Sequence, residues 1–216
     1  MIRAICFDMD GVLVDSERMS LRLVGESAAL QGCIMTPEQC EMSIGANDAR
    51  FRKILNDLFP GRIDVDRFMQ DWLDLTMEYV RREGVPLMPQ ARETLAMLRR
   101  RGMKLALCTS NVPEVVREYL ALAGLTDFFD AIITGDMVTR SKPDPSIYLL
   151  GAQSLGVPPE ECAGVEDSVS GVRAVHAAGM KCVMVPDVQP YTVALAAFVD
   201  HRIDHLGQLE EVLFSE

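Results

Sequence analysis

Two aspartates stand one residue apart at the end of an apolar segment near the N-terminus. The segment reads IRAICFDMD, and Asp8 and Asp10 follow a run of mostly apolar residues. Two carboxylates at this spacing repel each other, and the end of an apolar strand solvates them poorly. A divalent cation and a phosphate group would both offset the repulsion. The spacing therefore predicts a site for metal-assisted phosphate chemistry.

Polar residues also follow three later apolar segments. They are Thr109, Ser110 and Asn111 after MKLALC, Lys142 within SKPDP, and Glu166 and Asp167 after ECAGV. Each group alone has an ordinary explanation, because short polar residues cap helices and lysines are usually solvated on the surface. Their shared position after apolar segments favours one common site.

The elements that would position these residues alternate along the chain. From about residue 86, short apolar segments alternate with amphipathic segments of helical period, which predicts a parallel sheet covered by helices on both faces. We therefore expect a doubly wound α/β core. The carboxyl ends of its parallel strands would meet at one edge, where such sheets bind ligands.

A long helical stretch interrupts this core after the first strand. About 70 residues, 16 to 85, carry apolar residues at three- and four-residue spacing, with breaks at Gly32 and Pro60-Gly61. The sequence thus predicts a catalytic core formed by residues 1–15 and 86–216 and a helical cap domain formed by residues 16–85. An insertion at this position would lie over the ligand-binding edge as a lid.

Four segments of the chain, taken together, resemble a known family. FDMDGVLVDSE, CTSN, SKPDP and GVEDSVSGVRAVHAAGM are similar, in this order, to the four motifs of the haloacid dehalogenase-like hydrolase superfamily. Within it the chain resembles the β-phosphoglucomutase-like phosphatases, which carry a helical cap after the first strand. The resemblance implies hydrolysis of a small phosphorylated metabolite, for which a sugar phosphate is our first expectation.

The resemblance also implies a role for each polar residue. Asp8 would be the nucleophile that forms an aspartyl-phosphate, and Asp10 the general acid and base. The phosphoryl oxygens would be bound by Thr109, by the backbone near Ser110 and Asn111, and by Lys142. Mg²⁺ would be held by Asp8, the backbone carbonyl of Asp10 and Asp167, with Glu166 as a further ligand or a partner of one.

Composition limits the partners of the protein. The 216 residues carry a formal net charge of −11, which argues against a general affinity for nucleic acid or for an anionic membrane. The chain has no apolar run long enough to span a bilayer, and its six cysteines occur singly. We expect a reduced, cytoplasmic, monomeric protein with Mg²⁺ as its cofactor.

Two other functions remain open. A non-enzymatic phospho-receiver switch also uses acids, a threonine and a lysine, but its aspartate usually ends a middle strand of a shorter chain. A sugar-phosphate mutase of the β-phosphoglucomutase type would need groups that hold a second phosphate. In this chain Ser20 and Asp48 stand where those mutases carry a His and an Arg.

The sequence leaves the substrate-binding residues of the cap unassigned. The run Arg50-Phe51-Arg52-Lys53 is either a solvated helix face or an anion clamp, and the same holds for Arg81 and Arg82.

Overall fold

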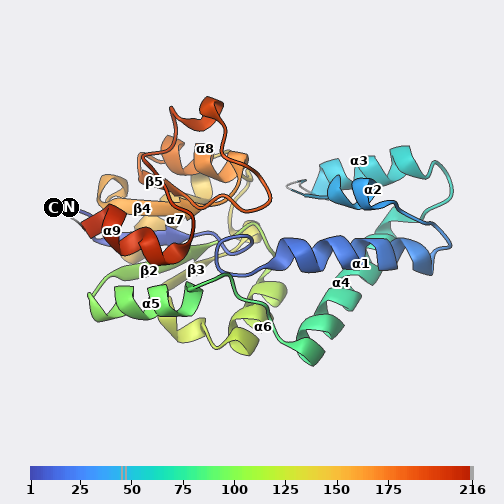
Figure 1. Cartoon of the computed structure of the whole chain (residues 1–216), viewed down its shortest axis with the longest axis horizontal. Helices are drawn as coiled ribbons and strands as arrows, with labels where there is room; N and C mark the ends of the chain where they lie inside the picture. The colour runs from blue at the N-terminus through green and yellow to red at the C-terminus, as the bar shows by residue number, and fades with distance from the viewer. Residues whose placement is uncertain (45, 47, 215–216) are drawn as a thin grey trace. The chain divides into compact units, whose positions relative to one another are not determined.

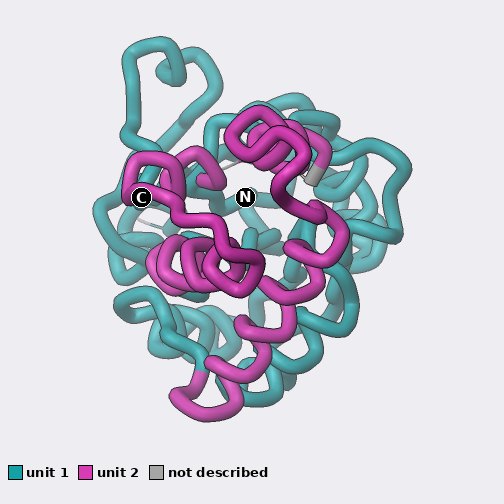
Figure 2. Tube along the Cα trace, turned by 90° about the vertical axis from the view of Figure 1, so that its right-hand side faces the viewer, with its two compact units in different colours: residues 1–15, 85–216 teal, residues 16–84 magenta. Residues whose placement is uncertain are grey.

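The computed structural model describes residues 1–44, 46 and 48–214. The chain forms two compact units, one made of Met1–Asp15 and Val85–Glu216 and the other of Ser16–Gly84 (Figure 2). The first unit holds the sheet and the second is helical. Whether the two units also fold as separate domains stays a prediction.

The first unit is built on one six-stranded sheet. Its strands are β1 (Ala4–Phe7), β2 (Lys104–Cys108), β3 (Ala131–Ile133), β4 (Cys162–Glu166), β5 (Lys181–Met184) and β6 (His201–Arg202). They lie in the order β3-β2-β1-β4-β5-β6, and every pair is parallel. This is the doubly wound order, and it confirms the predicted fold class.

Helices cover both faces of this sheet. They are α5 (Ala91–Arg100), α6 (Pro113–Ala123), α7 (Ser146–Leu155), α8 (Val169–Ala177) and α9 (Leu209–Phe214). Helices α7 and α8 pack on one face, against a core that includes Cys6, Cys108 and Cys182. The alternate residues of the same strands, such as Phe7 and Leu107, are also fully buried, so the opposite face is covered as well. Figure 1 shows α5 and α6 on that side.

The sheet order sets where the site can be. The chain moves from β1 outward to β2 and β3, then crosses back through α7 to β4 on the other side of β1. The switch point therefore lies between β1 and β4, where the connections leave the sheet in opposite directions. A crevice outside the carboxyl ends of two such strands is the usual ligand site of a doubly wound sheet.

The described residues of the second unit form four helices. They are α1 (Ser16–Leu30), α2 (Pro37–Glu41), α3 (Asp48–Leu58) and α4 (Val65–Glu83). Their core contains Phe51 and Phe68, whose rings pack edge-to-face with centroids 5.9 Å apart. A comparable contact joins Phe51 to Trp72 at 5.3 Å. Aromatic pairs of this kind add about 0.5–1.5 kcal/mol beyond the burial of their surface.

The structure contains elements that hydrophobic periodicity alone does not reveal. Helix α2 is too short to show a period, yet Thr36 and Gln39 form a capping box around Pro37 at its start. Strand β6 has only two residues. Short 3₁₀ turns lie at Thr126–Phe128, Gly135–Met137, Pro159–Glu161, Val193–Leu195 and Leu206–Gln208. No helix in the described ranges is both long and apolar enough to cross a membrane.

Candidate active site

Asp8 lies at the switch point, directly after the last residue of β1. Its backbone N–H donates to the carbonyl of Val165 on β4 at 3.0 Å, which holds the two strand ends together. The residue is only 8% exposed, so its carboxylate stands in a largely dehydrated site. This is the environment in which a neighbouring charge acts most strongly, because little water screens it.

Lys142 connects the two strands through their carboxylates. Its Nζ donates to Asp8 Oδ1 and to Glu166 Oε1, both at 2.7 Å, and to the carbonyl of Cys108 at 3.1 Å. The lysine side chain is 7% exposed. All three donor positions of the ammonium group thus have an acceptor, and the loop that carries Lys142 is tied to β1, β2 and β4.

Glu166 is fully buried, and donors surround its carboxylate. Oε1 accepts from Lys142 and, at 2.6 Å, from the hydroxyl of Tyr148. Oε2 accepts from the backbone N–H groups of Asp167 at 3.1 Å and Ser168 at 3.3 Å, and from the Ser168 hydroxyl at 3.1 Å. A carboxylate offers about four lone-pair positions, so these five donors occupy it. The geometry suits an anchor for Lys142 better than a metal ligand.

Burial and charge act against each other at this cluster. Burial raises the pKa of the Asp8 carboxyl to about 7, and Glu166 and Asp10 add to the rise while Lys142 opposes it. Burial lowers the pKa of Lys142, but the charges of Asp8 and Glu166 outweigh it, so this pKa rises above its usual value. Burial also raises the pKa of Glu166, yet Lys142 and Tyr148 bring the net result below the usual value. Lys142 and Glu166 thus stay charged.

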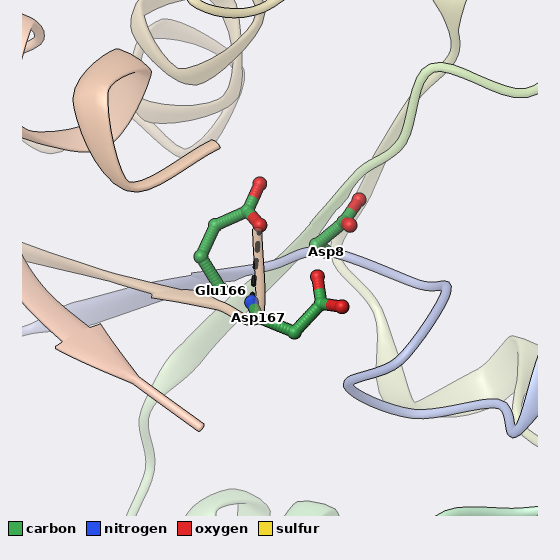
Figure 3. Close-up of side chains that lie close together, drawn as sticks. All are labelled: Asp8, Glu166 and Asp167. Atoms are coloured by element: carbon green, nitrogen blue, oxygen red, sulfur yellow. Dashed lines mark hydrogen bonds between the residues drawn. The ribbon is translucent and has the colours of Figure 1, made fainter. Parts of the chain in front are cut away.

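Asp167 brings a third carboxylate to the site. One oxygen each of Asp8, Glu166 and Asp167 lie within 4.8 Å of one another, and Figure 3 shows the carboxylate of Asp167 beside that of Asp8. Gly11 makes room for this arrangement. Its φ is +70°, and a Cβ there would lie 2.3 Å from Asp167 Oδ2, so a larger residue would displace the carboxylate. Because hydrogen bonds occupy the Glu166 oxygens, the carboxylates of Asp8 and Asp167 are the donors in this cluster whose chemistry fits a hard divalent cation.

Asp10 is held by a residue from the neighbouring strand end. Nδ2 of Asn111 donates to Asp10 Oδ2 at 2.5 Å. The sequence placed Asn111 at the phosphate through its backbone, and it gave no indication that the side-chain amide binds Asp10. Parallel neighbours β1 and β2 bring these two loops together, so only the sheet order could have revealed the contact.

Thr109 and Ser110 occupy different environments. Thr109 is fully buried, its N–H donates to the carbonyl of Ile133, and its Oγ1 accepts from the N–H of Asn111 at 3.2 Å. Ser110 is exposed. The structure therefore brings Asp8, Lys142, Glu166 and Asp167 into one cluster, with the Asp10–Asn111 pair beside them. The contribution of Thr109 and Ser110 to phosphate binding stays a prediction.

Tyr148 is the site residue that sequence reasoning missed. It is fully buried on α7, and its ring lies 5.1 Å from Lys142 Nζ, so one face contacts the cation while the hydroxyl binds Glu166. Burial, and next the charge of Glu166, raise the pKa of Tyr148, so the phenol remains a donor. A tyrosine six residues after the motif lysine, on the buried stripe of a predicted helix, was the only signal available.

In the second unit, residues of the basic run form ion pairs. Phe51 belongs to the core, while Arg52 and Lys53 form ion pairs with Asp66 and Asp57, each at 2.5 Å. These pairs are typical of a solvated helix face. Ser20 is half-buried on α1, and the side chain of Asp48 lies outside the described part of the structure.

The motifs and the geometry agree with known proteins. The family model of haloacid dehalogenase-like hydrolases matches residues 2–179 of the chain. Hexitol phosphatase B of Escherichia coli K12 is 31% identical over 223 residues, covering 96% of this chain and 94% of that protein. A phosphorylated carbohydrates phosphatase of Thermotoga maritima is 32% identical over 180 residues, covering 83% of each.

A solved structure supports the same assignment. CbbY from Rhodobacter sphaeroides, crystallised in complex with phosphate, superposes with a TM-score of 0.76 at 25% identity, covering 97% of this chain and 96% of that one. Together with the family match, these similarities confirm both the predicted family and the predicted enzyme class. The chain belongs to the haloacid dehalogenase-like hydrolase family and is a phosphatase.

Proposed function

We propose that the protein is a Mg²⁺-dependent phosphatase that hydrolyses a small sugar phosphate through an aspartyl-phosphate on Asp8. One observation carries the proposal. Asp8 stands at the switch point of the sheet, bound to Lys142 and within 4.8 Å of two further buried carboxylates. A nucleophilic carboxylate, a fixed cation and a set of oxygen ligands are the parts that phosphoryl transfer requires.

The metal would bind to Asp8, to Asp167 and to the backbone carbonyl of Asp10. Glu166 belongs to the same cluster, but five donors occupy its oxygens, so we assign it to holding Lys142. When bound, Mg²⁺ would neutralise the developing charge on the phosphoryl oxygens and reduce the repulsion between Asp8 and an anionic substrate.

In the first step a carboxylate oxygen of Asp8 attacks phosphorus in line with the leaving group. The new O–P bond forms as the bond from phosphorus to the alkoxide oxygen breaks. Lys142, held by Glu166, stabilises charge on the equatorial oxygens. Asp10 gives its proton to the departing alkoxide, which leaves as an alcohol, and the phosphoryl group remains on Asp8.

In the second step water hydrolyses the aspartyl-phosphate. The carboxylate of Asp10, now unprotonated, accepts a proton from the water as its oxygen attacks phosphorus. The bond from phosphorus to Asp8 breaks, inorganic phosphate is released, and both aspartates return to their initial states. Positioned proton transfer of this kind contributes about 10²- to 10⁴-fold to the rate.

Relatives support a phosphorylated carbohydrate as the substrate. A hexitol phosphatase and a phosphorylated carbohydrates phosphatase both align with more than four fifths of this chain. The phosphatase reaction fits the sequence better than a mutase reaction does, because Asp48 stands where the mutases carry an Arg and its negative charge would repel a second phosphate. A mutase would convert β-glucose-1-phosphate to glucose-6-phosphate faster than it released phosphate when supplied with a trace of the bisphosphate.

The experiment that tests the proposal is a substrate screen. Phosphate release from a panel of hexose, pentose and hexitol phosphates should require Mg²⁺, stop when EDTA is added, and return with excess Mg²⁺. Turnover that persists in EDTA would contradict the metal assignment, and absence of turnover on every phosphomonoester would contradict the function. We further expect the enzyme to act as a monomer in the cytoplasm, which gel filtration and cell fractionation would test.

A further inference from the structure

Asn111 is held in place from both sides of its loop. Its backbone N–H donates to Thr109 Oγ1 at 3.2 Å, and its carbonyl accepts from the N–H of Gly135 at 2.9 Å. Gly135 lets the loops after β2 and β3 approach closely, because a Cβ there would lie 2.3 Å from the Ser110 carbonyl oxygen. The side chain of Asn111 therefore leaves a fixed backbone.

Asp10 also leaves a defined turn. The carbonyl of Met9 accepts hydrogen bonds from the N–H groups of Leu13 and Val14, both at 2.9 Å, and Gly11 donates to the carbonyl of Val14 at 2.9 Å. The contact between Asn111 Nδ2 and Asp10 Oδ2 thus joins two ordered loops.

The chemistry of the amide gives this contact a direction. The Nδ2 group of asparagine can only donate, so it favours Oδ2 of Asp10 as an unprotonated acceptor. A proton on Asp10 is then best placed on Oδ1. Because a general acid must present its proton at one position, an amide that selects the oxygen also selects the line of proton transfer.

We propose that Asn111 is a positioning residue that orients the Asp10 carboxylate for proton transfer to the leaving alkoxide and from the attacking water. The inference rests on the proposed function, since it assigns Asn111 a part in that reaction. The sequence had suggested a different part, in which the loop around Asn111 binds the phosphoryl oxygens. A positioning role should matter only for substrates whose leaving group needs a proton, whereas a phosphate contact should matter for every phosphomonoester, and this difference provides the test.

A leaving group that needs no proton separates the two roles. The 4-nitrophenolate ion departs unprotonated near neutral pH, whereas a sugar alkoxide does not. We would measure kcat/KM for 4-nitrophenyl phosphate and for the best sugar phosphate, because this parameter reports the steps up to alcohol release. Asn111→Ala should lower it about 10- to 100-fold for the sugar phosphate and less than about threefold for 4-nitrophenyl phosphate.

Asp10→Asn should also lower kcat/KM for the sugar phosphate much more than for 4-nitrophenyl phosphate, and the loss on the sugar phosphate should be larger than for Asn111→Ala. In the double variant Asn111→Ala/Asp10→Asn the loss should not exceed that of Asp10→Asn, because both act on one proton transfer. Asn111→Ala should also show a burst of 4-nitrophenolate, since its aspartyl-phosphate is hydrolysed slowly. Asn56→Ala, which removes an exposed amide on α3, is the matched control and should leave kcat/KM unchanged for both substrates.

Asn111→Asp provides a second variant of the same size, in case the alanine variant does not fold. Its carboxylate would repel Asp10, so the loss on the sugar phosphate should be at least as large. An equal loss on both substrates would overturn the proposal in favour of a phosphate contact, and unchanged or faster sugar phosphate hydrolysis would also overturn it. If the wild type hydrolyses neither substrate, the proposed function itself fails, and this outcome is distinct.

Discussion

The sheet edge and the helical unit hold their charged residues in different ways. At the edge, Lys142 and Glu166 are 7% and 0% exposed, and each has more than one partner. In the helical unit, Lys53 and Asp57 are 75% and 63% exposed, and Arg22 and Glu26 form a similar exposed pair. Buried charges require partners in a defined geometry, whereas exposed pairs contribute little.

The difference indicates which parts of the chain can change without loss of the chemistry. A substitution at the edge leaves a charge without its partner in a site with little water, so both stability and catalysis should fall. A substitution on the solvated face of the helical unit should have little effect on either. The surface of the helical unit can therefore vary more freely than the sheet edge can.

The largest effect should come from Asp8→Asn. The amide has nearly the same size and its oxygen can still accept from Lys142, but it cannot act as the nucleophile. We expect kcat to fall by at least about three orders of magnitude, measured as phosphate release with Mg²⁺ present. Asp57→Asn makes the same chemical change on the helical unit and should keep wild-type turnover. Near-normal turnover of Asp8→Asn with an unchanged melting temperature would show that another residue is the nucleophile.

Lys142→Met should affect stability as well as catalysis. The variant keeps the length of the side chain but removes the donor shared by Asp8 and Glu166, and breaking a buried ion pair costs about 3–5 kcal/mol. We expect a lower denaturant midpoint together with a loss of kcat/KM of about 100-fold or more. Lys53→Met is the matched exposed control and should cost less than about 1 kcal/mol. Equal midpoints for the two variants would contradict the contrast between the edge and the helical unit.

The charged residues at the edge could be predicted because chemistry restricts their types. Asp8, Lys142 and Asp167 follow separate strands, and a parallel sheet brings strand ends together. Their mutual distances could not be predicted in the same way. The hydrogen bonds from five donors to the Glu166 carboxylate depend on where α7 and α8 pack. No local sequence pattern predicts that packing.

The missed features share a physical cause. Tyr148 has the ordinary spacing of a core residue, so the sequence does not indicate that its hydroxyl binds Glu166. That contact depends on how α7 packs on the sheet beside the end of β4. Asn111 was recognised, but its partner was not, since Asp10 is about 100 residues away in the sequence. Helix α2 is shorter than two turns and is identified by its capping box alone.

Tyr148→Phe would measure how much the edge depends on one neutral donor. The ring stays over Lys142, and only the hydrogen bond to Glu166 is lost, which is worth about 1.5–3 kcal/mol because the acceptor is charged. We expect kcat/KM to fall about 10-fold, equally for 4-nitrophenyl phosphate and a sugar phosphate, since Lys142 acts on the phosphoryl group in both. The control is Tyr191→Phe, because the Tyr191 ring lies 5.7 Å from the guanidinium of Arg202 and not beside Lys142. A loss confined to the sugar phosphate would instead place Tyr148 on the proton-transfer pathway.

The smallest effect should come from Lys53→Ala in the helical unit. Lys53 pairs with Asp57 one turn later on α3, and both side chains are largely exposed. Such a pair contributes about 0.2–0.5 kcal/mol, so the melting temperature should hardly move, and it should move even less at high salt. If the basic run is a solvated face, KM for every substrate in the panel stays unchanged. If it is instead an anion clamp, Lys53→Ala raises KM selectively for substrates with a second anionic group. Asp57→Asn, which frees Lys53 from its ion pair, then lowers KM for the same substrates.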